Sequence, residues 1–99
     1  MILGDWKGYI LTENGNPIKT DWSKVTMSFE INGDYEFVNP SLYKEEGKYT
    51  IHKEFLLTQP DDTDPSASRK VEIIKIALNT LIIRMNDGGN EIILHMVRV

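Results

Sequence analysis

The hydrophobic residues of this chain recur mainly at every second position, which is the period of a half-buried β-strand. The segment from Val25 to Ile31 is the clearest case, because its apolar residues alternate with Thr26, Ser28 and Glu30. No long window shows the period of about 3.6 residues, with capping residues at its ends, that marks an amphipathic helix. The pattern predicts an all-β fold with little or no helix.

Turn residues separate the predicted strands. Asn32-Gly33 follows the strand just described, and an Asn-Gly step favours a type I′ hairpin turn because both central residues need positive φ. Asn14-Gly15 and the Asp87-Gly88-Gly89-Asn90 segment repeat this pattern. The predicted strands cover residues 6–13, 25–31, 35–38, 47–52, 55–59, 70–76, 80–85 and 91–99, and residues 17–20 form a ninth if they pair with the first. Short antiparallel strands in one small domain hide their edges by closing into a barrel or by packing as two sheets.

Length and charge limit the possible functions. Ninety-nine residues fit a single domain spanning residues 1–99. The net charge of −4 repels phosphate backbones, so we expect no nucleic-acid partner. The apolar runs are far shorter than the roughly twenty residues that span a bilayer, so we expect no membrane insertion. The N-terminus lacks the features of a signal peptide, and localisation stays undetermined: secreted or periplasmic if a leader was removed, open otherwise.

The residues offer little for catalysis or metal binding. The chain has no cysteine, and its two histidines, His52 and His95, lack metal-ligand spacing and are expected to point outward. Asp62 and Asp64 have the first spacing of a calcium loop, but the later glycine and glutamate of such a loop are missing. Neither a nucleophile elbow nor a phosphate-binding glycine loop is present. We expect no catalytic site, metal or cofactor, and the acidic segment 60–68 should be an exposed loop.

Several short motifs suggest a family. A Gly-x-Trp motif ends at Trp6, Phe-x-x-x-Gly spans residues 29–33, Gly-x-Tyr-x-Ile spans residues 47–51, and Arg98 stands in the last strand. In order and spacing these motifs resemble short bacterial lipocalin-like (calycin) domains. The resemblance implies an eight-stranded antiparallel up-and-down meander barrel. It also implies that Trp6 closes one end of the barrel with the Arg98 guanidinium stacked across its ring.

Strict alternation from an inward Trp6 assigns the interior of this barrel. The inward set is Trp6, Ile10, Val25, Met27, Phe29, Ile31, Tyr35, Phe37, Tyr49, Ile51, Phe55, Leu57, Ile73, Leu81, Ile83, Ile92, Leu94, Met96 and Arg98. Ile73 is the least secure member, because Lys75 shares its face.

Two hypotheses about function follow from this interior. In the first, the protein is a non-catalytic binding module for a small apolar or amphipathic ligand inside the barrel. The predicted ligand-binding residues are Met27, Phe29, Tyr35, Phe37, Tyr49 and Phe55, with Tyr35 and Tyr49 as hydroxyl donors and Arg98 as a charge partner. In the second, these side chains are ordinary core, and a solid barrel acts in protein interaction or structure through its outer surface.

Consecutive isoleucines in the last three strands predict an apolar outer face. In each of the pairs 73–74, 82–83 and 92–93, one residue must face out when the other faces in. The predicted interface residues are Ile74, Ile76, Ile82, Ile93 and Val97. Either the segment 17–23, with Ile18 and Trp22, covers this face, or a second copy covers it in a two-fold homodimer. The homodimer is favoured, because one short segment cannot cover three strands.

Overall fold

The computed structural model describes residues 2–39, 44–61 and 68–99. The order of elements is β1 (Gly4–Glu13), β2 (Asn16–Pro17), the 3-10 helix η1 (Trp22–Lys24), β3 (Thr26–Phe29), β4 (Asp34–Val38), β5 (Lys44–His52), β6 (Phe55–Pro60), β7 (Arg69–Ile76), β8 (Thr80–Asp87) and β9 (Asn90–Arg98). In the described part of the chain, η1 is the one helical element, which agrees with the near absence of helix predicted from the alternating pattern.

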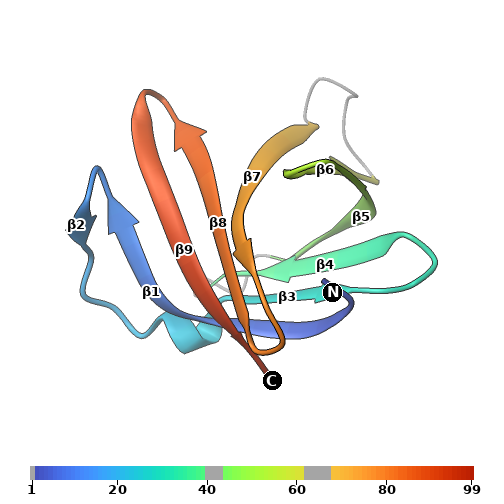
Figure 1. The fold of residues 1–99 in the computed structure, drawn as a ribbon, viewed down its shortest axis with the longest axis horizontal. Helices are drawn as coiled ribbons and strands as arrows, with labels where there is room; N and C mark the ends of the chain where they lie inside the picture. The colour runs from blue at the N-terminus through green and yellow to red at the C-terminus, as the bar shows by residue number, and fades with distance from the viewer. Residues whose placement is uncertain (1, 40–43, 62–67) are drawn as a thin grey trace.

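The strands form a closed antiparallel meander (Figure 1). Each strand from β4 to β9 pairs with the strand that precedes it in the chain, and β1 pairs with both β3 and β9. This last pairing closes the barrel and removes the exposed edges that an open sheet would present. The predicted eight-stranded up-and-down barrel is therefore confirmed. The ninth strand exists as β2, which adds to β1 through the pair Thr12 and Pro17.

The meander divides the connections between two ends of the barrel. At one end, called the Trp6 end here, the N-terminal segment lies with the β3–β4, β5–β6 and β7–β8 turns. At the other, the Trp22 end, the β1–β2 turn lies beside the β8–β9 turn, where the Asn14 side chain donates to that of Asn90 at 3.0 Å.

The turns follow the predicted chemistry in two of three places. Asn14 and Gly15 both have positive φ (51° and 85°), as do Gly88 and Gly89 (58° and 90°), which fits two type I′ turns. The type I′ turn predicted at Asn32-Gly33 is wrong, because of these two residues only Gly33 has positive φ. The Glu30 N–H bonds to Asp34 O across a three-residue loop, whose glycine takes the left-handed position.

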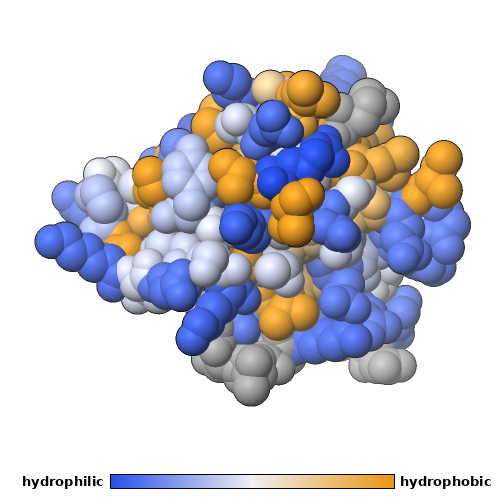
Figure 2. Space-filling view, turned by 90° about the horizontal axis from the view of Figure 1, so that it is seen from below, coloured by the Kyte–Doolittle hydropathy of each residue, from blue (hydrophilic) through white to orange (hydrophobic). Residues whose placement is uncertain are grey.

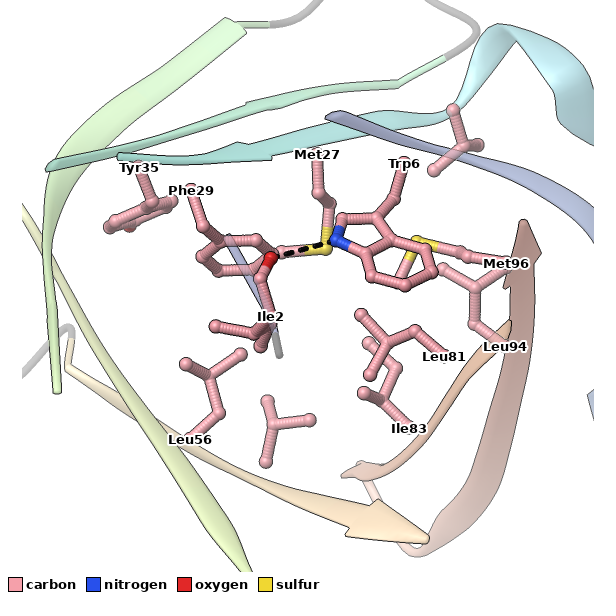
Figure 3. Packing of buried hydrophobic residues seen from close by; sticks show 12 residues of the cluster. Ile2, Trp6, Met27, Phe29, Tyr35, Leu56, Leu81, Ile83, Leu94 and Met96 are labelled. Carbon is pink, nitrogen blue, oxygen red and sulfur yellow. Dashed lines mark hydrogen bonds between the residues drawn. The ribbon is translucent and has the colours of Figure 1, made fainter. Parts of the chain in front are cut away.

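One hydrophobic cluster fills the barrel (Figure 3). Its buried members come from nearly every strand: Ile2, Trp6, Val25, Met27, Phe29, Tyr35, Leu56, Val71, Leu81, Ile83, Leu94 and Met96. Trp6, Leu56, Leu81 and Met96 are wholly inaccessible to solvent. Trp6 Nε1 donates to the Ile2 carbonyl at 2.8 Å, so the N-terminal segment is tied to the core that it covers.

A β-bulge in β1 changes one predicted orientation. Gly8 pairs with Met96 and Ile10 with His95, so Tyr9 is the extra residue and the alternation shifts by one. Strict alternation predicted that Ile10 faces inward, and this prediction is wrong because Ile10 is exposed. Leu11 packs against the core in its place.

The inward assignments of Phe55 and Leu57 are also wrong. A two-residue turn places His52 opposite Phe55, so Ile51 lies opposite Leu56 and shares its face. Leu56 is buried inside the barrel, and Leu57 is exposed on its outer wall. The Lys70 Nζ lies 4.1 Å from the centre of the Phe55 ring.

A second bulge, at Ile74, explains the conflict between Ile73 and Lys75. Ile73 pairs with Ile83 and Lys75 with Ile82, so Lys75 leaves the face of Ile73. After the bulge, Ile76 lies opposite the wholly buried Leu81 and is therefore on the inner face, which corrects its prediction as an outer residue. Ile31 was predicted inward, but it follows the end of β3 in a turn and is 88% exposed.

The predictions for the histidines, the acidic loop and membrane insertion concern residues outside the core. Both histidines face away from the core, as expected: His52 is exposed, and His95 makes an edge contact with Tyr9, with ring centroids 6.0 Å apart. Asp62 and Asp64, with most of the predicted acidic loop, lie outside the described residues. No helix in the described ranges is long and apolar enough to cross a membrane.

Candidate ligand-binding site

Trp6 and Arg98 stack together at one end of the barrel, on the side where β1 pairs with β9. The Arg98 Cζ lies 4.2 Å from the centre of the Trp6 ring, in the stacked arrangement that the family resemblance implies. Arg98 also donates from Nη1 to the Leu3 carbonyl at 2.6 Å and from Nε to the Leu78 carbonyl at 2.8 Å. A β-carbon at Gly4, where φ is +115°, would lie 2.6 Å from Arg98 Nη1. The glycine of the Gly-x-Trp motif therefore makes room for the guanidinium.

A polar network lies on the inner face of β4–β7. The buried Glu45 carboxylate accepts a hydrogen bond from the Tyr35 hydroxyl at 2.6 Å and pairs with Arg69 at 3.3 Å. Burial, followed by the hydrogen bond to Glu45, raises the pKa of Tyr35 above its usual value, and a further hydrogen bond with Thr58 opposes this rise. We call these four residues the Glu45 network. Its polar groups satisfy one another, which removes the cost of burying them.

The Trp6 end contains a hollow of about 690 Å³ that opens to solvent. This volume falls within the range of roughly 300–1,000 Å³ that is typical of small-molecule sites. Its lining combines the N-terminal segment, the β3–β4 and β5–β6 turns and the ends of β5 and β7: Ile2, Leu3, Ile31, Tyr49, Ile51, Lys53, Glu54, Ile73, Ile74, Lys75 and Ile76. Most of these side chains are apolar, so the hollow suits an apolar guest.

The hollow forms because β7 runs past the beginning of β6. The Ile73 N–H bonds to the Glu54 carbonyl in the β5–β6 turn, so the rest of β7 extends beyond that turn. Inward residues at the strand ends consequently lack neighbours on one side. Ile51, opposite the buried Leu56, is 45% exposed, and Ile76, opposite the buried Leu81, is 40% exposed. Their exposure reflects an open barrel end rather than an outward orientation.

The six predicted ligand-binding residues do not form one site. Tyr49 lines the hollow, and Phe29 supports it through an edge contact with ring centroids 5.1 Å apart. Met27, Phe29 and Tyr35 are buried core residues, and Phe37 packs partly buried against them. Phe55 lies on the outer wall, where it contributes to a separate hollow with Lys70 and Arg84. Only Tyr49 is thus both predicted and placed at the candidate site.

The proposed hydroxyl donors and charge partner are already engaged. Tyr35 donates to Glu45, Tyr49 donates to the Glu30 carbonyl at 2.8 Å, and Arg98 bonds to two carbonyls. Burial raises the pKa of Tyr49, so its hydroxyl stays protonated and keeps its hydrogen bond to the Glu30 carbonyl. The charged groups that line the hollow are Lys53, Glu54 and Lys75 instead.

The N-terminal segment contributes to the core and to the hollow, which the sequence pattern did not predict. Ile2 precedes the first predicted strand, yet it is buried in the core and lines the hollow together with Leu3. An apolar Ile-Leu pair before Gly-x-Trp was the available signal. Lys53 was missed because a residue in a turn has no strand parity, and the position of Lys75 depends on the bulge at Ile74.

The predicted interface residues divide between two surfaces. Ile82, Ile93 and Val97 lie half-buried on the outer face of β8 and β9, whereas Ile74 and Ile76 line the hollow. The segment with Trp22 does not cover this outer face. Trp22 packs against the core cluster, and its carbonyl would lie 2.7 Å from a β-carbon at the buried Gly8. On the face of the molecule seen in Figure 2, hydrophobic residues are interspersed with hydrophilic ones.

Solved structures with the same architecture include two from Bacteroides. A lipocalin-like protein from Bacteroides uniformis ATCC 8492 matches with a TM-score of 0.76 at 12% identity, covering 99% of this chain and 98% of that one. An uncharacterized protein from Bacteroides eggerthii DSM 20697 matches with a TM-score of 0.70 at 12% identity, covering all of both chains. The chain therefore has a short lipocalin-like fold.

Sequence comparisons give no further assignment. No family model matches the chain. A search of curated proteins also finds no match. Within the described residues, no group of three or more His, Asp or Glu side chains could hold a metal ion.

Proposed function

We propose that this protein is a non-catalytic binding module that takes a small apolar or amphipathic ligand at the Trp6 end of its barrel. The observation that carries the proposal is the hollow of about 690 Å³, lined mainly by apolar side chains, of which Ile51 and Ile76 face inward yet remain exposed to solvent. Covering such side chains with an apolar guest removes their surface from water at about 25 cal/mol per Å².

The location refines the sequence-based hypothesis of a ligand in the barrel interior. Met27, Phe29 and Tyr35 bury one another in the core, so the ligand is proposed to rest on Tyr49, Ile51 and Ile73 nearer the opening. The lipocalin-like fold supports a binding function in general terms.

Titration with a neutral apolar fluorophore, N-phenyl-1-naphthylamine, tests the proposal. We expect saturable binding at one site and at least tenfold weaker binding by the Ile51→Gln variant, because glutamine places a polar group in the hollow. The matched control is Ile18→Gln. Ile18 is 38% exposed, close to the 45% of Ile51, but lies outside the hollow. Absence of saturable binding, or equal losses in the two variants, would contradict the proposed site.

A second candidate function is protein interaction through the outer wall, in the form of a two-fold homodimer. The bulge in β1 supports it, because it turns Ile10 outward next to β9. Ile10 joins Ile82, Ile93 and Val97 in an outer isoleucine face on β1, β8 and β9. A self-complementary patch of this kind fits an isologous dimer.

Light scattering over micromolar concentrations tests the dimer. We expect Ile82→Glu to yield a folded monomer while the unaltered chain shows twice that mass. Val99→Glu is the control, since Val99 is strongly exposed beyond the end of β9. A monomer at every concentration for the unaltered chain would remove this candidate.

A further inference from the structure

The pairing of β7 with β8 stops before either strand ends, which leaves an open seam at the Trp22 end of the barrel. The last pair of this ladder is Glu72 with Arg84, although β7 begins at residue 69 and β8 continues to residue 87. Residues 69–71 remain paired with β6, and residues 85–87 remain paired with β9. Figure 1 shows β7 and β8 diverging toward the β8–β9 turn. In the described part of the chain, these two stretches therefore face each other as strand edges without a ladder between them.

The backbone groups of Lys70 and Asn86 point into this seam. The Ile73 N–H bonds to the Glu54 carbonyl beside β6. Because the bonding direction alternates along a strand, Lys70 directs its N–H and C=O away from β6. In the two-residue β8–β9 hairpin, the residue directly before the turn bonds to β9, so Asn86, one position earlier, faces away from β9. Each edge thus offers one donor and one acceptor to the seam.

A hollow of about 450 Å³ lies along the seam, and its lining includes Lys70 from β7 and Asn86 from β8. The Arg84 guanidinium beside it is balanced by two carboxylates, since it pairs with Glu72 and, at 3.5 Å, with Glu91. Lys70 lies over the Phe55 ring instead, and none of the ion pairs between described residues includes it. The seam therefore combines strand edges with one cation that an anionic partner can approach.

We infer that an extended peptide enters the seam as a short added strand, antiparallel to β8 and parallel to β7, with an acidic residue between Asn86 and Lys70. Free N–H and C=O groups on a sheet edge are satisfied by another extended backbone. In this orientation the central peptide residue exchanges two hydrogen bonds with Asn86, and its two neighbours bond to Lys70 on the other side. The seam is separate from the hollow at the Trp6 end, so this inference does not depend on the proposed ligand there.

Alternation determines which side chains such a peptide needs. A residue level with Asn86 and Lys70 points outward as they do, so a carboxylate at that position meets the Lys70 ammonium group. Its two neighbours point inward, where Val71 is buried and Met85 packs partly buried against the core. The seam therefore fits a peptide with an apolar–acidic–apolar sequence.

Amide NMR titration with the peptide acetyl-Thr-Val-Asp-Val-Thr-amide tests the inference. We expect saturable shifts of the Lys70 and Asn86 amide signals, because these groups gain backbone partners. Replacing the peptide's aspartate by lysine should weaken binding about threefold, as the loss of an exposed charge interaction does. N-methylation of the aspartate should weaken binding about fivefold, because it removes one backbone donor.

The Lys70→Gln variant should lose the preference for the aspartate peptide over the lysine peptide. Its matched control is Lys7→Gln, which makes the same charge change at an exposed lysine on β1, outside the seam. The control should keep the preference of the unaltered chain.

Several outcomes would overturn the inference. Absence of shifts at millimolar aspartate peptide would refute binding, and unchanged affinity of the N-methylated peptide would refute the added strand. Equal affinities of the aspartate and lysine peptides for the unaltered chain would refute the acidic residue. Shifts confined to Tyr49 and Ile51 would place the peptide in the hollow at the Trp6 end instead. Fluorophore binding at that hollow is measured separately, so either proposal can fail while the other stands.

Discussion

The hollow and the Glu45 network lie in the interior of the same barrel, but their side chains differ in burial and in whether they have partners. In the Glu45 network, Glu45 is buried and its carboxylate has Tyr35 and Arg69 as partners. In the hollow, Ile51 and Ile76 face inward yet keep 45% and 40% of their surface exposed. Polar groups are satisfied in one region, and apolar groups are left uncovered in the other.

This contrast separates stability from binding. Buried polar groups that satisfy one another favour a single arrangement, and replacing one of them leaves an unsatisfied partner. Exposed apolar side chains in a concave site stabilise the fold little, because water still reaches them, but they gain from an apolar guest. Changes in the closed core should therefore act on folding, whereas changes in the hollow should act on binding.

The largest expected effect is at Trp6, which lies wholly buried in the core beneath Arg98. Trp6→Ala should lower the free energy of unfolding by about 3–5 kcal/mol, because it removes a wholly buried aromatic side chain. Arg98→Ala should cost less, through lost stacking and the lost hydrogen bonds to the Leu3 and Leu78 carbonyls. Urea denaturation measures both. A near-neutral Trp6→Ala would show that this end of the barrel does not hold the fold together.

Ile2 tests whether the N-terminal segment belongs to the core or only borders the hollow. Ile2→Ala should cost about 2–3 kcal/mol, at the lower part of the range for buried isoleucine, because a segment near the chain end can partly relax. Leu3→Ala is the control, since Leu3 lines the same hollow but is exposed. Thermal unfolding should distinguish them, and equal small effects would place the segment outside the core.

Regular alternation and turn residues were sufficient to predict the strands, because both act locally along the chain. The errors arose where alternation stops. Bulges after Gly8 and at Ile74 reversed the orientations of Ile10 and Ile76. Consecutive apolar residues concealed these shifts, since either parity gives an apolar inner face. In β6, the two-residue turn determines that Leu56 rather than Leu57 faces inward, and two consecutive leucines gave no way to predict which of them does.

The candidate site was harder to predict than the fold for a related reason. The hollow depends on the offset between the β5–β6 turn and the end of β7, which is a property of pairing register. Tyr49 could be identified as inward from alternation. Lys53 could not, because a residue in a turn has no strand parity.

Gly8 tests the packing of η1 at the other side of the core. A β-carbon there would lie 2.7 Å from the Trp22 carbonyl and 3.4 Å from a Leu94 methyl group. Gly8→Ala should destabilise by about 1–3 kcal/mol, as overpacking usually does. Gly15→Ala is not a suitable control because Gly15 has positive φ, so Lys7→Ala, on the same strand but exposed, serves instead. Equal stability of the two variants would mean that η1 moves without cost.

The smallest effect at neutral pH is expected in the Glu45 network, where pH gives the sharper test. Tyr35→Phe removes the hydrogen bond to Glu45 and should cost about 1 kcal/mol at pH 7. Because the pKa of Tyr35 is raised in the folded state, the unfolded chain loses this proton first as pH rises. The stabilisation is complete below the usual value of 10 and decreases above it, so the free energy of unfolding should fall with rising pH from about 10. Urea denaturation of both proteins between neutral pH and pH 11 should show a shallower decline for Tyr35→Phe. If the free energy of unfolding falls equally steeply in both proteins, the pH dependence comes from another group. The Tyr49→Phe variant then tests whether that group is Tyr49, whose pKa burial also raises.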